Sequence, residues 1–262
     1  MAMMQSPGGP VPDIARMPRG GPDASWLDRL LETGRAEYLD RDDVDADVKR
    51  RVISVLDRVG EVFKEHERNA RLVLEEVADV ADPRILELGS GHGGLSRVVL
   101  EQHPTARVTV TDINPASVAR IADGDLGNHR RATVAVTDAT DIDAPDRSYA
   151  LAVMAMTFHH LPPPLAARVI AEGTRVADKM LIVDLARPPS LLHIVRLATM
   201  LPFAPLHPFV HDGIISSMRC YSRSALRALA AHGAPGIHAR FVSPLLGPEA
   251  VVFERQSVAS SR

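Results

Sequence analysis

A glycine-rich segment at residues 87–94, Glu-Leu-Gly-Ser-Gly-His-Gly-Gly, carries the residue types best suited to ligand binding. Apolar residues before it predict a strand at residues 85–88, and apolar spacing after it predicts a helix from about Leu95. A glycine turn between a strand and a helix lets the backbone approach a ligand closely and directs free N–H groups at it. Glu87, just before the turn, is a poor neighbour for a pyrophosphate but a good one for a cation. The segment therefore predicts a site for a ligand with a positively charged group.

The glycine spacing fits two patterns. Residues 89–94 match G-x-G-x-x-G, the dinucleotide pattern, which is weak evidence on its own. Residues 87–93 also match acid-x-G-x-G-x-G, and in this the chain resembles the class I S-adenosylmethionine-dependent methyltransferases. A strand–glycine–helix corner without a ligand is the structural alternative. The resemblance implies that the amino-acid end of S-adenosylmethionine is bound by Glu87, Gly89, Ser90 and Gly91.

Two later strand ends extend the resemblance. A strand expected at residues 108–111 ends at Asp112, and an acid in this place can accept both hydroxyls of a ribose. The resemblance implies that Asp112 holds the ribose and that Ile113 packs on the adenine. It also implies that Asp138 and Ala139, after a third strand at residues 132–136, contact the adenine ring. A nicotinamide enzyme would share Asp112 but has no need for Asp138, whose alternative role is to cap a turn.

A fourth strand, expected at residues 149–155, is followed by His-His-Leu-Pro, and both features resemble the family. We count Met154 in this strand among the cofactor-binding residues. Ala150 departs from the family, because many members carry Asp there, and the change puts local hydrogen bonding in doubt more than chemistry. With a fifth strand at residues 180–184, the resemblance covers roughly residues 70–188.

His159 and His160 are the candidate catalytic residues. A hydroxyl or phenol acceptor gains from a base whose pKa is near neutral, and histidine is the natural choice. The alternative is that they satisfy backbone carbonyls at a strand–helix corner. His211 and Tyr221 are candidates for substrate binding, although either can be structural. A metal site built from His159, His160 and His211 is conceivable, but the chain has neither cysteine pairs nor H-x-x-x-H spacing, so we expect no metal.

Composition limits the partners. A chain of 262 residues that is 45% hydrophobic can bury one substantial α/β core with appended helices. Its net charge of −3 disfavours a nucleic-acid partner. A single cysteine, Cys220, excludes an intramolecular disulfide and fits a reducing compartment, and the N-terminus lacks a secretory pattern. We therefore expect a cytoplasmic protein that binds small molecules.

The elements expected around these residues form an α/β fold: a doubly wound, seven-stranded, mostly parallel sheet. Residues 1–22 and 258–262 are expected to be disordered tails. Residues 23–80 are expected to form an N-terminal helical cap, which either covers the ligands or only one face of the sheet. The S-adenosylmethionine-binding domain then spans residues 81–257, with strands near 237–242 and 251–255 completing the sheet.

After the fifth strand, residues 188–218 form a helical insertion too short and too interrupted to span a membrane. Because ligands of open α/β sheets bind beyond the carboxyl ends of the strands, we interpret this insertion as a substrate lid. Its apolar residues favour an apolar or aromatic acceptor, although a packing arm or a homodimer contact explains them equally well.

The sequence thus predicts a cytoplasmic methyltransferase for a small, apolar or aromatic metabolite, with O-methylation favoured. The preference for a small molecule rests on analogy with the family and on the apolar insertion. Two alternatives stay open: an NAD(P)-dependent oxidoreductase, and a catalytically inactive methyltransferase-like binding protein.

Overall fold

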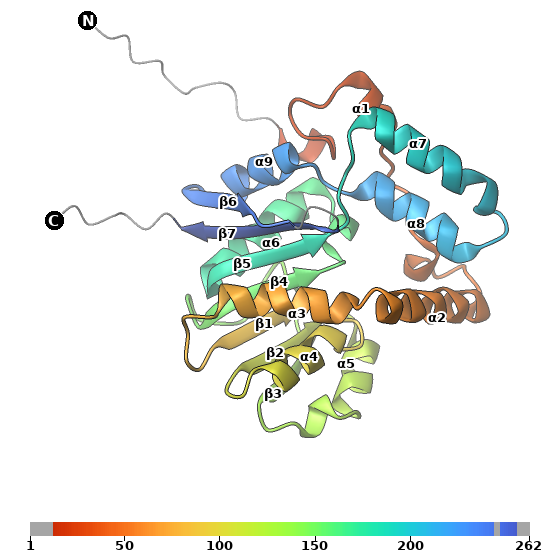
Figure 1. Ribbon diagram of the computed structural model, residues 1–262. Coiled ribbons are helices and arrows are strands. Elements are labelled where there is room, and N and C mark those ends of the chain that lie inside the picture. Colours follow the sequence, from red (N-terminus) through yellow and green to blue (C-terminus); the bar gives the residue numbers. More distant parts are fainter. Residues whose placement is uncertain (1–12, 244–246, 256–262) are drawn as a thin grey trace, which may run out of the picture.

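The computed structural model describes residues 13–243 and 247–255, and these form a three-layered α/β unit around one seven-stranded sheet (Figure 1). The strand order is β3-β2-β1-β4-β5-β7-β6. Strands β1 to β5 are parallel, whereas β7 runs antiparallel to both of its neighbours. The predicted doubly wound, mostly parallel sheet is confirmed. The strands are β1 (Arg84–Leu88), β2 (Arg107–Asp112), β3 (Ala132–Val136), β4 (Tyr149–Ala155), β5 (Ala177–Asp184), β6 (Ile237–Phe241) and β7 (Glu249–Arg255).

Helices cover both faces of the sheet. Leu86, Met180 and Phe253 lie in one buried cluster with α6 (Pro163–Val176) and α9 (Arg223–Gly233). On the opposite face, α3 (Glu65–Glu76) and α4 (Gly94–Gln102) pack against Ile85 and Val108, and α5 (Pro115–Ala122) lies beside β2 and β3. The central strands are apolar on both faces because both faces are buried.

Caps at the helix ends agree with the local sequence. The Asn114 side chain accepts a hydrogen bond from the backbone of Ala116, and Pro115 begins α5. Ser222 caps α9 in the same way by accepting from the Ala225 N–H. These caps place the start of each helix directly after the strand or loop that leads into it.

The N-terminal region packs partly on the sheet and partly beyond it, and whether it also covers the ligands stays a prediction. Helix α3 packs on the sheet, and α2 (Ala46–Val62) extends beyond it to contact α8 (Pro208–Arg219). The short α1 (Trp26–Leu30) and the 3-10 turn η2 (Tyr38–Asp40) precede them. Only part of the apolar face of α2 is covered: Val52 is buried, whereas Leu56 and Val62 are exposed.

The predicted N-terminal tail, residues 1–22, is wrong for residues 13–22. After the 3-10 turn η1 (Ile14–Arg16), Met17 is buried in the core cluster that contains α6 and α9. The Arg19 side chain is buried and donates to two backbone carbonyls, those of His159 and Arg219. One buried apolar side chain and one hydrogen-bonding side chain thus fix residues 13–22, whose sequence has no helical or strand periodicity. Residues 1–12 and the predicted 258–262 tail lie outside the described residues.

The insertion after β5 is helical. It consists of α7 (Ser190–Met200), the 3-10 turn η5 (Leu201–Phe203) and α8, which lie with α2 beyond the carboxyl ends of the parallel strands (Figure 1). Leu191, Leu192 and Leu206 are more than half exposed, so much of its apolar surface faces outward. Within the described residues, no helix is long and apolar enough to cross a membrane.

Candidate functional site

The glycine loop lies where the strand order reverses between β1 and β4, the position at which open α/β sheets bind ligands. Gly89, Gly91 and Gly93 all have positive φ, with values of 67°, 59° and 79°. A Cβ placed on Gly91 would point into open space, since no other atom lies within 4 Å of it. The loop therefore leaves an accessible backbone surface at its second glycine, as the sequence predicted.

Two buried hydroxyls beside the loop have no partner. Ser90 is 8% exposed, and its Oγ is buried without a hydrogen-bond partner. Thr157 Oγ1 is likewise buried without a partner. Thr157 follows β4, and its Oγ1 lies 3.0 Å from the position of a Cβ on Gly89. Because buried polar groups are normally hydrogen-bonded, the two hydroxyls indicate a site built for a polar ligand.

Asp112 connects the glycine loop to the end of β2. One carboxylate oxygen accepts from the Gly91 N–H at 2.9 Å, and the other accepts from the Asn114 N–H at 2.9 Å. The neighbouring Ile113 side chain is 66% exposed. A carboxylate beside the loop and an uncovered apolar side chain are available there, and their contacts with ribose and adenine stay predictions.

The remaining predicted cofactor residues differ in the groups that a ligand could contact. Asp138 Oδ1 accepts from both the backbone and the hydroxyl of Thr140, which lowers the pKa of Asp138 and keeps it ionised. Ala139 follows in the same loop and packs on the core. Met154 is 4% exposed with its side chain inside the core, and its backbone lies between Leu88 of β1 and Ile182 of β5, so its contact with the cofactor stays a prediction.

Glu87 lies beneath the loop. The Ser96 hydroxyl of α4 donates to its carboxylate, and the residue is 4% exposed. Burial raises its pKa to about 7, against the opposing effect of the Ser96 hydrogen bond. Glu87 therefore connects β1 to α4 from below, and its charge changes near neutral pH.

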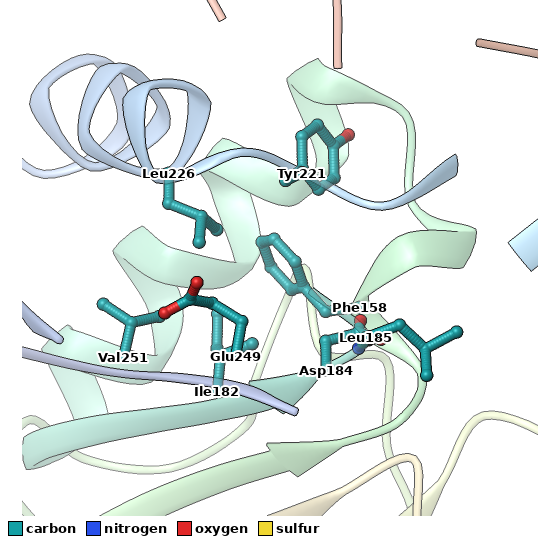
Figure 2. Close-up of a pocket in the computed structure, with 8 residues that line it drawn as sticks. All are labelled: Phe158, Ile182, Asp184, Leu185, Tyr221, Leu226, Glu249 and Val251. Atoms are coloured by element: carbon teal, nitrogen blue, oxygen red, sulfur yellow. Dashed lines mark hydrogen bonds between the residues drawn. The ribbon is translucent and has the colours of Figure 1, made fainter. Parts of the chain in front are cut away.

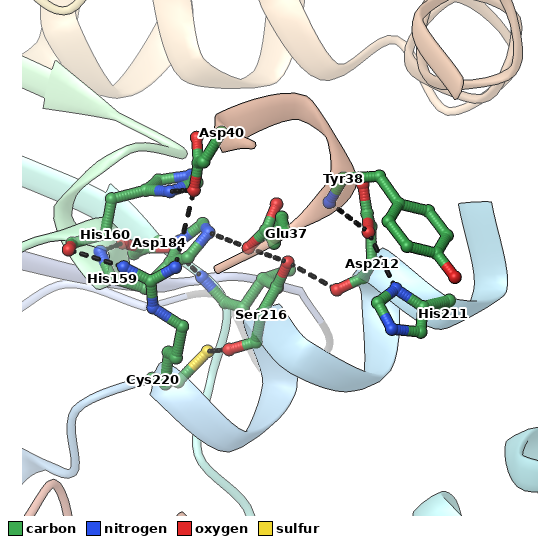
Figure 3. Close-up of polar contacts among 12 residues, drawn as sticks. Glu37, Tyr38, Asp40, His159, His160, Asp184, His211, Asp212, Ser216 and Cys220 are labelled. Carbon is green, nitrogen blue, oxygen red and sulfur yellow. Dashed lines mark hydrogen bonds and ion pairs between the residues drawn. The ribbon is translucent and has the colours of Figure 1, made fainter. Parts of the chain in front are cut away.

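His159 is held between two carboxylates (Figure 3). Its Nδ1 lies 2.7 Å from Asp184 Oδ1, its backbone N–H donates to Asp184 Oδ2 at 2.7 Å, and its Nε2 lies 3.4 Å from Glu37 Oε1. Burial opposes the imidazolium, but the charge of Asp184 and the hydrogen bonds of both carboxylates outweigh it and raise the pKa of His159 to about 10. Near neutral pH His159 is a buried cation, which does not suit it to act as a general base.

His160 forms a second pair with an acid from the N-terminal region. Its Nδ1 lies 2.9 Å from Asp40 Oδ2, and Arg219 of α8 donates to the His160 carbonyl at 2.6 Å. Burial raises the pKa of Asp40, but His160 and Arg219 outweigh this effect and keep the carboxyl ionised. The two histidine rings lie 4.3 Å apart between centroids. His160 is the more accessible of the two, with 29% of its side chain exposed.

The two predicted substrate residues are not brought together with each other. His211 on α8 stacks on Tyr38 at 4.0 Å between centroids and lies 3.0 Å from Asp212. Tyr221 is buried against Phe158, and its hydroxyl donates to the Leu161 carbonyl at 2.7 Å. The adjacent cavity, lined by Tyr221, Phe158 and Asp184 among others, measures about 10 Å³ (Figure 2). It has room for about one water molecule and not for an acceptor, so Tyr221 serves packing there.

Sequence reasoning missed the acids that surround the histidines. Asp184 could have been found, because it ends a parallel strand as Asp112 does. Glu37 and Asp40 come from a stretch without periodicity, and nothing in the sequence connects them to residues about 120 positions away. Glu37, His159 and His160 form the one group among the described residues whose ligand atoms could hold a metal, within 4.8 Å of one another. His211, which the sequence argument had considered as the third ligand, is not part of it.

Comparisons with known proteins agree with this geometry. Residues 85–179 match a family model described as a methyltransferase domain. A malonyl-[acyl-carrier protein] O-methyltransferase of Geobacter sulfurreducens is 34% identical over 110 residues, which are 42% of this chain and 39% of that protein. The match thus spans well under half of the relative.

Two solved structures share the fold. The plantazolicin methyltransferase BpumL, in complex with S-adenosylhomocysteine, has a TM-score of 0.63 at 14% identity, over 87% of this chain and 98% of that one. Human N-acetylserotonin methyltransferase, in complex with S-adenosylmethionine, has a TM-score of 0.58 at 17% identity, over 88% and 66% of the two chains. At these identities the likeness concerns the fold.

Proposed function

We propose that this chain, whose residues 85–179 belong to a methyltransferase domain family of the class I fold, transfers a methyl group from S-adenosylmethionine to an oxygen of a small, apolar or aromatic acceptor. The observation that carries the proposal is the pair of histidine–carboxylate contacts beyond β4 and β5, next to the glycine loop. It combines a cofactor cradle with groups able to handle an acceptor's proton.

The cradle fits the cofactor. The open side of Gly91, the unpaired hydroxyls of Ser90 and Thr157, and the carboxylate of Asp112 offer polar contacts. The exposed Ile113 offers an apolar surface for the adenine, and Asp138 an acceptor for its amino group. When bound, the cofactor supplies an electrophilic methyl group on a sulfonium. The protein then has to align the acceptor with that methyl group and exclude water.

We assign different roles to the two histidines. Asp40 is ionised and accepts from Nδ1 of His160, which leaves Nε2 of the ring to receive or polarise the acceptor's proton. His159 is already protonated and acts as a positioning residue that connects Asp184 to Glu37. An oxygen acceptor is favoured because a hydroxyl must lose its proton during the transfer, and His160 offers the place for it.

The lid defines the acceptor side. Helices α7 and α8 lie beyond the carboxyl ends of the parallel strands and contact each other, and α2 contacts α8. Arg219 and Ser216 of α8 bind the same acids that hold the histidines. An apolar insertion in this place suits an apolar or aromatic acceptor. No described feature favours a nucleic acid.

Methyl transfer tests the proposal directly. The full chain is incubated with S-adenosylmethionine labelled in its methyl group and with matched sets of phenols, alcohols and amines, and labelled product is measured. We expect turnover of a phenol or alcohol. His160→Gln should lower kcat by about 100-fold or more, since general acid–base catalysis contributes 10²–10⁴-fold. His238→Gln, an exposed histidine on β6, serves as the control and should keep full activity.

Calorimetry separates the alternatives. Binding of S-adenosylmethionine and S-adenosylhomocysteine without binding of NAD supports the proposal. Binding of NAD alone would identify an oxidoreductase. Cofactor binding without turnover of any acceptor in the three sets would favour a methyltransferase-like binding protein.

A further inference from the structure

A second binding capacity lies in the same cluster of side chains. The N-terminal strap, which we define as residues 37–40, brings Glu37 to His159 and Asp40 to His160 (Figure 3). We infer that Glu37, His159 and His160 form a binding site for one divalent transition-metal ion of the zinc type. Their ligand atoms come from parts of the chain about 120 residues apart and lie within 4.8 Å of one another.

The tautomers suit metal binding. Asp184 and Asp40 are both ionised, so each accepts a hydrogen bond from Nδ1 of its histidine, at 2.7 Å and 2.9 Å. With Nδ1 occupied in both rings, Nε2 is the nitrogen through which each ring can bind a metal, and in the protonated His159 the ion would displace the Nε2 proton that faces Glu37. Metal-binding histidines almost always donate their other ring N–H to a carboxylate or carbonyl, because this fixes the ring and raises its basicity. Both histidines already have this support.

The separation of the ligand atoms also fits. His159 Nε2 and Glu37 Oε1 lie 3.4 Å apart, longer than an ordinary charge-assisted hydrogen bond. Two ligands that each bind zinc at about 2.0–2.1 Å with tetrahedral geometry are separated by about 3.3–3.4 Å. The two atoms could therefore bind one ion with little movement. His160, which is more exposed, can rotate to supply the third ligand.

The net charge of the side chains around the proposed site favours binding of a cation. Four carboxylates, of Glu37, Asp40, Asp184 and Asp212, are connected through the two histidines, Tyr38 and Ser216. The Arg219 guanidinium lies 3.4 Å from Asp40, and the Arg19 guanidinium is held nearby by the backbone carbonyls of His159 and Arg219. With the His159 imidazolium counted, these groups carry an excess of one negative charge, and a divalent ion that displaces the His159 proton would bring their sum to zero. Burying such an excess without a counterion is costly.

The ligand set selects the kind of metal. Two imidazoles and one carboxylate suit zinc and similar transition metals, whereas magnesium and calcium prefer oxygen ligands throughout. Three protein ligands leave at least one coordination position open, which is typical of catalytic sites rather than structural ones. In a step that rests on the proposed function, a hydroxyl oxygen of the acceptor would fill this position, and the ion would lower the pKa of that hydroxyl in place of His160. The hydroxyl proton would pass to water as the bond between oxygen and methyl forms and the bond between sulfur and methyl breaks.

Metal binding is measured on the metal-free full chain by calorimetry with Zn²⁺ and, separately, Mg²⁺. Co²⁺ serves as a spectroscopic probe through its visible absorption. We expect one Zn²⁺ per chain, binding at least about 100-fold tighter than Mg²⁺, and a visible Co²⁺ band characteristic of nitrogen and oxygen ligands. Glu37→Gln and His160→Gln should each weaken Zn²⁺ binding at least tenfold and remove the band. Asp40→Asn, which changes a residue that supports His160 but is not itself a proposed ligand, should weaken binding by about 10–100-fold.

His238→Ala is the matched control, because it removes an exposed histidine outside the cluster and should leave Zn²⁺ binding unchanged. Circular dichroism of each variant establishes that it is folded. Zn²⁺ binding that is unaffected in a folded Glu37→Gln or His160→Gln protein would overturn the site, as would the absence of a Co²⁺ band in the wild type.

Turnover with and without a chelator distinguishes this inference from the proposed function. Zinc binding with the expected mutational pattern supports the site even where no acceptor is methylated. Full methyl transfer in the presence of the chelator, together with no zinc binding, would keep the proposed function and overturn the metal site.

Discussion

At the scale of single residues, the ends of the parallel strands concentrate acids with distinct environments. Glu87 in β1 is buried, Asp112 at the end of β2 binds the glycine loop, and Asp184 at the end of β5 binds a charged histidine. Burial alone favours the neutral form, and hydrogen bonds or a nearby cation favour the ionised form. Carboxyl groups near the ends of three parallel strands thus have three different environments.

The ribose assignment predicts a difference between two aspartates. Asp112→Ala should weaken S-adenosylhomocysteine binding by at least about tenfold, because charge-assisted hydrogen bonds contribute about 1.5–3 kcal/mol each. Asp141→Ala, an exposed residue that we assign no contact with the cofactor, should change the dissociation constant little. Calorimetric titration of both variants provides the measurement. Equal effects would mean that the end of β2 does not hold the ribose.

Glu87 predicts a pH dependence of stability. Its pKa in the folded state, about 7, lies above the ordinary value of 4.5, so the folded protein holds this proton more tightly than the unfolded chain does. The protonated Glu87 contributes fully to stability below pH 4.5, and this contribution is lost as the pH rises toward 7. The total loss in the free energy of unfolding is on the order of 3 kcal/mol. Urea unfolding of the cofactor-free protein should show a flatter pH dependence between 4.5 and 7 in Glu87→Gln. An unchanged slope would contradict burial of an ionisable group there.

At the scale of elements, the insertion after β5 covers the side on which the acceptor is expected. Leu197 and Met200 of α7 are partly buried, and Met200 approaches Gly213 of α8, so the two helices pack as a pair. Their outward surface is apolar. The elements that we expect to form the cofactor cradle are β1, β2 and the loops after β3 and β4, which end before the insertion begins.

This separation predicts that the lid controls the acceptor and not the cofactor. Replacing Leu197 and Met200 with Ser should raise the acceptor KM or abolish turnover, because both changes weaken the apolar helix pair. The dissociation constant for S-adenosylhomocysteine should change by less than about tenfold, or about 1.4 kcal/mol. Joint loss of cofactor binding and turnover would show instead that α7 and α8 close over both ligands.

Element by element, much of the fold could be predicted from the sequence. The strands and α9 follow from apolar periodicity and from caps such as Ser222, which act within a few residues. The glycine loop followed from a local pattern as well. The acids around the histidines could not be predicted, because Glu37 and Asp40 meet them only through long-range packing of the strap. The order of residues 13–22 was missed for the same reason: Met17 and Arg19 find their partners far along the chain.

At the scale of the whole molecule, one network connects three regions. Glu37 of the strap, Asp184 at the end of β5 and Ser216 of α8 are connected through His159 and the Glu37 carboxylate. The imidazolium of His159 is the charge that lets two carboxylates stay buried together. The free energy of unfolding should therefore change when His159 loses its proton. The raised pKa makes the direction of that response predictable.

In the folded state the pKa of His159 is raised from 6.5 to about 10, so its contribution to stability is complete below pH 6.5 and is lost as the pH rises toward 10. Between pH 7 and 9 the unfolding free energy of the metal-free protein should fall, with a slope approaching about 1.4 kcal/mol per pH unit for one proton. His159→Gln should flatten this slope whatever its effect on absolute stability. Urea unfolding at several pH values provides the measurement, with His238→Gln as the control that should keep the wild-type slope.

Above about pH 8 this window isolates His159 from the other buried groups, because Glu87, with a pKa of about 7, has titrated by then. The buried Cys220 thiol has a raised pKa in the folded state, and it affects stability only as the pH exceeds its ordinary value of 9.0. His193, whose pKa burial lowers to about 4, destabilises the folded state only below its ordinary value of 6.5. A wild-type slope that persists in His159→Gln between pH 8 and 9 would therefore have to come from exposed groups. In that case the strap, the sheet and the lid would not depend on the proton of His159.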